Sequence, residues 1–421
     1  MNKLNASRRV WITSALAASI VGAVWPLASQ AQQPPIKIGF SQSLTGPLAS
    51  AGKAALVAIQ MWAEDVNAKG GLLGRKVELV HYDDQSNPGL VPSIYSKLLD
   101  VDKVDLIVTS YSTNMEVPTI AFAMQRGLLL MGSIGVAPNH KFNYKRFFEA
   151  FPGGPDPLGA LSEGYFALAQ TLQPKPKTVA LAGADTEFGQ NSLEGARKNA
   201  KKAGIKIVYD KSYPPNTVDF ASIIRAIQAT HPDLVFFASF PSDSIGLIRA
   251  TKQVGLTAQM LGGAMVGMQY ASVKTQLGPL LNGVVAYDVY VPEPTMKFPG
   301  IEAFLKRYQA VAGKEGIDAL GFYIPPLIYS EMQVLGQAVS AVGSIDQDKL
   351  ADYIRSNTFQ TIMGDVKFGE KGEWAQSRIL YVQYRDVVGN DLEQFKRPGT
   401  QVIIYPEKLK SGELKVPYSG S

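Results

Sequence analysis

The chain of 421 residues contains no cysteine. Without cysteine it can form no disulfide bond, no zinc–thiolate site, no thiol nucleophile and no lipid-modified N-terminal cysteine. Histidine is also scarce: the chain has 3, at positions 81, 140 and 231, and histidines in such strand, loop and helix-end settings more often face solvent or cap a helix than catalyse a reaction. We therefore expect neither a thiol enzyme nor a lipid-anchored protein.

Motifs of other enzyme classes are missing as well. No phosphate-binding loop of the Walker type is present, and Gly132-Ser133-Ile134-Gly135 lacks the spacing of a serine nucleophile elbow. Asp83-Asp84 could suggest a metal site, but a pair of acids after a strand more often caps the following turn. The sequence thus predicts no catalytic residue, no metal and no cofactor.

The first 31 residues have the features of an export signal. A basic start is followed by the apolar run Val10–Leu27 and by Ser29-Gln30-Ala31, a small-x-small cleavage site. Polar residues and a proline interrupt the run, which argues against a retained membrane span. We expect a mature chain that starts near Gln32, and Ser7-Arg8-Arg9 leaves open whether export uses the general or the twin-arginine route.

Removal of this signal also changes the charge of the protein. Residues 1–31 contain Lys3, Arg8 and Arg9 and no acidic residue, so their loss would lower the formal charge from +5 to +2. A chain with so little excess positive charge lacks the electrostatic attraction that nucleic-acid binding needs. We expect no nucleic-acid partner.

One stretch, residues 36–88, defines the architecture. It reads as an apolar strand at Ile36–Phe40, a polar turn, a helix at Ala54–Ala68, the glycine-rich stop Gly70–Arg75 and a second strand at Val77–Tyr82. A strand, helix and strand of this length form a right-handed crossover unit of a parallel sheet. The hydroxyl-rich turn after the first strand would lie at the sheet edge where such folds bind ligands.

The same alternation of strands and helices continues to about residue 152. It then starts again after Phe151–Pro155, a segment rich in residues that break both strand and helix. Even without its signal the chain exceeds the size of one comfortable hydrophobic core. These observations predict two α/β lobes, each with a doubly wound parallel sheet.

Three separated motifs resemble a known family. The order G-F-S-x-S-L-T-G-P, then D-V-N-A-K-G-G-L-L-G-R-K, then Y-D-D-Q-S-N-P is similar to that of type I periplasmic solute-binding proteins of the branched-chain amino-acid family, the receptors of ATP-driven importers. The likeness covers roughly residues 36–405. It implies two lobes with a ligand cleft between them and three crossings of the chain, of which the third would lie near Thr361–Gly364. It also implies a periplasmic, monomeric protein that delivers a small molecule to an inner-membrane permease and its cytoplasmic ATPase.

The resemblance gives boundaries for these parts. After the signal peptide at 1–31, we expect the N-terminal lobe at 36–152 plus 285–362, the C-terminal lobe at 153–284 plus 363–408, and a loosely held tail at 409–421.

The resemblance also implies two ligand-contacting turns in the first lobe. At one of them the hydroxyl of Thr113 would meet a ligand carboxylate, and backbone amides and Ser133 would add hydrogen bonds. The alternative is that these residues only cap helices. The first turn consists of Tyr111, Ser112, Thr113 and Asn114, and the second consists of Ser133, Ile134, Gly135 and Val136.

Departures from the family pattern bear on the ligand. Val136 replaces a threonine that helps hold an amino acid, Ala264 stands at the position of a glutamate that pairs with the ammonium, and Ala51 replaces an aromatic residue. Burying an ammonium group without a carboxylate is strongly unfavourable. Phe188 and Phe240 stand where tyrosines often occur, and flat apolar faces favour a ring-bearing ligand; the alternative is that both phenylalanines belong to the core of the lobe.

The leading hypothesis is therefore a periplasmic receptor for a small aromatic carboxylate that closes its lobes over the ligand. A branched-chain or other apolar amino acid is the alternative, in which case Asp243 or Asp288 could supply the missing carboxylate. The ligand-sensing domain of a signalling system is a second alternative. The sequence does not tell whether Gln42, Tyr287 or Tyr323 reach the pocket.

Overall fold

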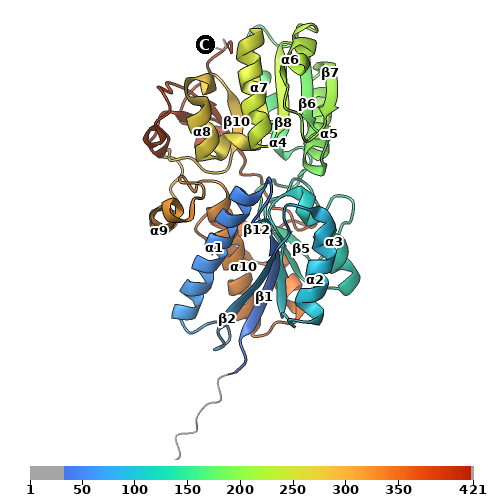
Figure 1. Cartoon of the computed structure of the whole chain (residues 1–421), viewed down its shortest axis with the longest axis vertical. Helices are drawn as coiled ribbons and strands as arrows, with labels where there is room; N and C mark the ends of the chain where they lie inside the picture. Colours follow the sequence, from blue (N-terminus) through green and yellow to red (C-terminus); the bar gives the residue numbers. More distant parts are fainter. Residues whose placement is uncertain (1–32, 419–421) are drawn as a thin grey trace, which may run out of the picture. The chain divides into compact units, whose positions relative to one another are not determined.

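Parallel strands form two separate sheets in the computed structural model, which describes residues 33–418 (Figure 1). The first sheet has 5 strands in the order β2-β1-β3-β4-β5, and every neighbouring pair is parallel. Its strands are β1 (Ile36–Gln42), β2 (Val77–Asp83), β3 (Leu106–Val108), β4 (Leu130–Gly132) and β5 (Phe147–Glu149).

Helices between these strands cover the first sheet. They are α1 (Ala49–Ala68), α2 (Val91–Asp100) and α3 (Thr113–Arg126), with the 3-10 turn η1 (Pro88–Leu90) before α2. Helix α1 stops at a glycine turn, because the amide of Gly71 bonds to the Val66 carbonyl and a Cβ at Gly71 would lie 1.9 Å from the Arg75 carbonyl oxygen. The predicted strand–helix–strand unit is present, with α1 beginning five residues before the expected start.

The second sheet has 7 strands in the order β14-β13-β10-β9-β8-β6-β7. Strand β13 runs antiparallel to its neighbours β10 and β14, and the other pairs are parallel. The strands are β6 (Thr178–Ala184), β7 (Lys206–Tyr213), β8 (Leu234–Ser239), β9 (Met260–Met265), β10 (Val285–Asp288), β13 (Leu380–Tyr384) and β14 (Gln401–Tyr405). The predicted α/β class with two sheets is confirmed.

Five helices accompany the second sheet. They are α4 (Ala160–Ala169), α5 (Glu187–Lys202), α6 (Ala221–Gln228), α7 (Pro241–Val254) and α8 (Ala271–Leu277). This part of the chain also contains short 3-10 turns: η2 (Val266–Gln269), η3 (Gly278–Leu281), η4 (Leu392–Lys396) and η5 (Glu407–Leu409).

Three later helices return to the first sheet: α9 (Ile301–Glu315), α10 (Ile324–Val342) and α11 (Gln347–Ser356). Helix α10 lies beside α1 (Figure 1), and the absence of a side chain at Gly336 lets the Trp62 ring approach to 3.0 Å from the position of a Cβ there. Arg307 on α9 pairs with Glu64 and Asp65 on α1. We call the first sheet with α1–α3 and α9–α11 the first lobe, and the second sheet with α4–α8 the second lobe.

The expected return of the chain to the first lobe at residue 285 is wrong, because β10 belongs to the second sheet. Val285 and Ala286 pair with Gly262 and Gly263 of β9, and β10 also pairs with β13. The chain therefore leaves the second sheet only after Asp288. A short apolar segment fits either sheet by its pattern alone, which is why the sequence placed it on the wrong one.

The third crossing also lies later than expected. Thr361 and Gly364 close the hairpin of β11 (Thr358–Thr361) and β12 (Gly364–Lys367), where Gly364 takes a φ of +77°. Beyond it, Trp374 Nε1 donates to the carbonyl of Glu149 over 3.0 Å, and the Arg378 amide donates to the carbonyl of Pro152 over 3.0 Å. The third crossing thus runs beside the first, near Arg378 rather than at Thr361–Gly364.

The expected loosely held tail is wrong for residues 409–418. The Ser411 amide bonds to the Ile403 carbonyl over 2.8 Å, and the Tyr418 amide bonds to the Ala258 carbonyl over 3.1 Å. The Tyr418 side chain is 2% exposed. These contacts fix the tail to the second lobe.

Both lobes belong to one compact unit that begins at Pro34. Within residues 33–418, the structure contains no helix with the length and apolar character of a membrane span. The predicted signal peptide at 1–31 lies outside the described residues.

Candidate ligand-binding site

A cavity of about 640 Å³ is lined by residues of both lobes. The lining segments follow the carboxyl ends of β1, β2, β3, β6, β7, β8 and β9, where open α/β sheets bind ligands. The first lobe contributes Pro47, Leu48, Ser86 and Asn114, and the second contributes Thr186, Pro215, Asn216, Phe240, Pro241, Ser242, Asp243, Ile245, Ser272, Val273 and Gln276.

The start of helix α3 supplies hydrogen-bond donors on the first-lobe side. Ser112 precedes the helix with a φ of 92°, and its hydroxyl is buried without a hydrogen-bond partner in residues 33–418. The amides of Thr113 and Asn114, like all amides in a first helical turn, have no carbonyl partner inside the helix. Free amides and the helix dipole together favour an anion at this end.

The structure brings the two predicted contact turns together. The Val136 amide donates to Thr113 Oγ1 over 2.8 Å, and the Ser112 amide donates to the Ile134 carbonyl over 3.2 Å. The Ser133 amide donates to Thr109 Oγ1 over 2.7 Å. Because Thr113 Oγ1 accepts the Val136 amide, its own proton remains available to another acceptor.

Of the predicted site residues, Asn114 and Phe240 line the cavity. Phe188 is buried behind Phe240, with ring centroids 5.0 Å apart. The Phe188 amide donates to Asn114 Oδ1 over 3.3 Å, which joins the lobes at the cavity wall. A second hydrogen bond between the lobes runs from Asn191 Nδ2 to the Val136 carbonyl over 2.8 Å.

The remaining predicted residues lie away from the cavity lining. Ala51 is buried in the first turn of α1, and Ala264 is buried in β9. Thr113 and the turn 133–136 lie beside the cavity rather than on its surface. Gln42 donates to the Gly52 carbonyl over 2.9 Å, so its side-chain amide supports the first turn of α1.

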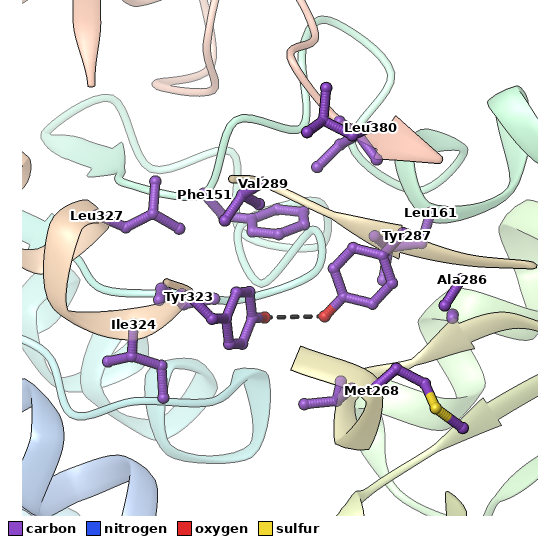
Figure 2. Packing of buried hydrophobic residues seen from close by; sticks show 14 of the residues in the cluster. Phe151, Leu161, Met268, Ala286, Tyr287, Val289, Tyr323, Ile324, Leu327 and Leu380 are labelled. Atoms are coloured by element: carbon purple, nitrogen blue, oxygen red, sulfur yellow. Dashed lines mark hydrogen bonds between the residues drawn. The ribbon is translucent and has the colours of Figure 1, made fainter. Parts of the chain in front are cut away.

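A cluster of four buried tyrosines connects the lobes next to this site. The hydroxyl oxygens of Tyr287 and Tyr323 lie 2.8 Å apart, as Figure 2 shows, and Phe151 packs edge-on against Tyr287. Burial raises the pKa of Tyr111 to about 12, and the neighbouring hydroxyls of Tyr270 and Tyr323 oppose the rise. We call Tyr111, Tyr270, Tyr287 and Tyr323 the tyrosine cluster.

Sequence reasoning left Tyr287 and Tyr323 open and missed Tyr270. Tyr270 follows β9 and the turn η2. The signal that could have found it is its place after the carboxyl end of a strand, because the other contact turns occupy the same kind of place.

A buried carboxyl pair lies beneath the second contact turn. Glu116 Oε1 accepts from Thr109 Oγ1 over 3.1 Å, and Glu149 Oε1 accepts from the amides of Gly135 over 3.3 Å and Phe151 over 3.1 Å. Burial and then the charge of Glu149 raise the pKa of Glu116 well above its usual range.

Burial likewise raises the pKa of Glu149 to about 7 and the pKa of Glu331 well above its usual range. Glu149 therefore keeps a large neutral fraction near neutral pH, and the raised pKa values of all three carboxyl groups weaken their repulsion of a bound anion. No sequence signal pointed to them, because they come from α3, β5 and α10.

Asp243 is the acidic residue on the cavity wall. Its Oδ2 accepts from the Tyr213 hydroxyl over 3.3 Å, and its Oδ1 accepts from the Ser242 hydroxyl over 3.1 Å. Burial raises the pKa of Asp243. Asp288, the other candidate from the sequence, is buried away from the cavity, where burial raises its pKa to about 6 and Lys274 opposes the rise. Residues 33–418 contain no group of three potential metal ligands.

Comparisons with known proteins agree with this architecture. A family model described as periplasmic binding protein matches residues 35–386. A leucine-, isoleucine-, valine-, threonine- and alanine-binding protein of Pseudomonas aeruginosa is 26% identical over 339 residues, which are 80% of this chain and 87% of the relative.

Two solved structures illustrate the likeness of fold. A leucine-binding protein from Thermotoga maritima superposes with a TM-score of 0.71 at 18% identity, over 83% of this chain and 96% of the other. A solute-binding protein of an ABC transporter from R. palustris in complex with benzoate superposes with a TM-score of 0.70 at 18% identity, over 88% and 95%. At these identities the likeness shows the fold alone.

Proposed function

Because the chain belongs to the periplasmic binding protein family, we propose that it captures a small aromatic carboxylate in the cavity between its lobes. Its relatives are substrate-binding proteins rather than enzymes, and the chain is a binding protein of the ABC-transporter type. The observation that carries the proposal is the pairing of an uncapped helix start on one side of the cavity with a phenylalanine wall on the other.

The carboxylate would bind at the start of α3. The Ser112 hydroxyl, which has no partner among the described residues, and the first-turn amides would donate to it. Each hydrogen bond to a charged group contributes about 1.5 to 3 kcal/mol. The neighbouring carboxyl of Glu116 would oppose this binding if it were ionised, and its raised pKa reduces that opposition.

The ring would pack against Phe240. Phe188 supports Phe240 from behind, and Leu48 extends the apolar surface on the first lobe. Stacked or edge-on aromatic pairs contribute about 0.5 to 1.5 kcal/mol beyond the burial of their area. A flat ligand therefore gains more from this wall than a branched aliphatic side chain does.

An apolar amino acid is a second candidate, because Asp243 lines the cavity and could pair with an ammonium group. Against it stands the absence of the family's ammonium partner: Ala264, near the carboxyl end of β9, has no carboxylate, and Val136 has no hydroxyl. The relative from Pseudomonas aeruginosa is named for binding leucine, isoleucine and valine, so both ligand classes belong in one test.

Export to the periplasm and delivery to a permease and its cytoplasmic ATPase are part of the proposal, as is a monomeric state. Ligand would favour the shut arrangement of the lobes because it touches residues of both. The permease would then recognise the shut form.

A thermal-shift screen of the chain from Gln32 onward tests the ligand class. Aromatic carboxylates such as benzoate and 4-hydroxybenzoate should raise the melting temperature, since a ligand at one hundred times its Kd adds about 2.7 kcal/mol of stability. Leucine, isoleucine and valine are the comparison set. Stabilisation by these amino acids and by no aromatic acid would overturn the proposal.

A further inference from the structure

Asp243 is a buried carboxylate with no cationic partner among residues 33–418. It is 3% exposed, and the ion pairs among the described residues do not include it. Its two side-chain hydrogen bonds come from neutral hydroxyl groups, those of Tyr213 and Ser242, and the backbone amide of Phe240 also interacts with the carboxylate. Removing a charge from water is costly unless hydrogen bonds or an opposite charge replace the hydration.

The position of Asp243 in the first turn of α7 accounts for part of its stability. Acidic residues are favourable there because of the helix dipole. An exposed side chain would serve that purpose equally well, yet Asp243 is buried and lines the cavity. The local role therefore leaves the burial unexplained.

The carboxylate retains capacity to accept hydrogen bonds. An ionised carboxylate offers about four lone-pair directions, and only two side-chain donors reach Asp243, one of them at the long distance of 3.3 Å. Asn114 lies on the first-lobe side of the same cavity, beside the free amides of α3. The cavity thus has anion-binding donors on one lobe and a strong acceptor on the other.

We propose that Asp243 accepts a hydrogen bond from an O–H or N–H group on the ring of the ligand, opposite the carboxylate. The inference rests on the proposed function and names its substrate class: aromatic carboxylates that carry a hydroxyl or amino substituent. A ligand with a second carboxylate at this end is excluded, because two like charges would be buried together.

The proposed hydrogen bond predicts the relative affinities of a series of substituted benzoates. The better of 3-hydroxybenzoate and 4-hydroxybenzoate, or the matching aminobenzoate, should bind about tenfold or more tightly than benzoate, because the new hydrogen bond ends on a charged acceptor. Replacing the hydroxyl by methoxy keeps the size of the substituent and removes the donor. 4-Methoxybenzoate and 3-methoxybenzoate should therefore lose the advantage.

Calorimetric titration of the chain from Gln32 onward with this series is the test, repeated on Asp243→Asn. In that variant the preference for the donor-bearing acids over benzoate should fall by about tenfold. Asp219→Asn is the control, since Asp219 accepts the amide of Ala221 at the start of α6 and is exposed. It should keep the full preference.

The outcomes separate the two claims. If no aromatic acid binds to the wild type, the proposed function fails and this inference fails with it. If benzoate binds as tightly as every hydroxy- and aminobenzoate, only the inference is overturned, whatever happens to the folding of Asp243→Asn. Tight leucine binding that Asp243→Asn abolishes would assign Asp243 to an ammonium group and overturn the inference as well.

Discussion

The hydroxyl groups of Tyr287 and Tyr323 share a hydrogen bond of 2.8 Å that joins the two lobes. Tyr287 belongs to β10 in the second sheet, whereas Tyr323 immediately precedes α10 on the first lobe. Both rings are buried, with 1% and 3% of their surface exposed. The bond therefore couples the relative position of the lobes to the packing around the segment after Asp288, where the chain crosses back to the first lobe.

We expect Tyr287→Phe and Tyr323→Phe each to lower the free energy of unfolding by about 0.5 to 1.5 kcal/mol. Because the two hydroxyls are partners, the double variant should cost clearly less than the sum of the singles. Urea unfolding of the four proteins measures the coupling, and Tyr209→Phe on β7 of the second lobe is a control outside the tyrosine cluster. Additive effects of the two substitutions would show that the hydroxyls act independently.

Thr113→Val should weaken binding of the aromatic acid found in the screen by about tenfold. The substitution keeps the shape of the side chain but removes the acceptor of the Val136 amide, which loosens the second contact turn. Thr113→Ser should restore most of the affinity, since it retains the hydroxyl. Thr119→Val is the control within α3, because Thr119 Oγ1 donates to the Met115 carbonyl inside the helix. Equal affinity of Thr113→Val and wild type would remove Thr113 from the site.

Phe240 and Phe188 should respond differently to truncation. Phe240→Ala should reduce affinity for the aromatic acid by tenfold or more with a modest loss of stability, because the ring lines the cavity and is only half-buried. Phe188→Ala should cost about 3 kcal/mol or more of stability, because the ring is 4% exposed. Calorimetric titration and urea unfolding of both variants separate the roles. A large affinity loss from Phe188→Ala alone would reverse the assignment.

Much of the site could be predicted because it depends on local sequence. The turns at 111–114 and 133–136 follow strands β3 and β4, and adjacent parallel strands place their following turns side by side. The Phe188 and Phe240 pair arises in the same way, since β6 and β8 are neighbours in the second sheet. Recognising the order of strands was enough to bring these residues together.

The rest of the site depends on contacts between distant segments. Glu116, Glu149 and Glu331 read as ordinary surface acids in a sequence, because nothing local shows that the three carboxyl groups are buried together. The sequence also failed to predict the sheet to which β10 belongs and the place of the third crossing, for the same reason. Both are decided by pairing partners far along the chain, Gly262 and Gly263 for β10 and Pro152 for the crossing segment.

The buried carboxyl of Glu149 predicts how stability depends on pH. Burial raises its pKa from 4.5 to about 7, so the folded state holds a proton that the unfolded state releases, and stability should fall as pH rises from about 5 to 7. Glu116 and Glu331, whose pKa values are also raised, add to the fall in stability as pH rises. In Glu149→Gln the side chain cannot ionise, so the free energy of unfolding, measured with urea, should fall less between pH 5 and pH 8 than in the wild type. Glu163→Gln, at an exposed position on α4, is the control and should follow the wild type. An unchanged slope in Glu149→Gln would mean that Glu149 is already ionised at pH 5 in the folded protein.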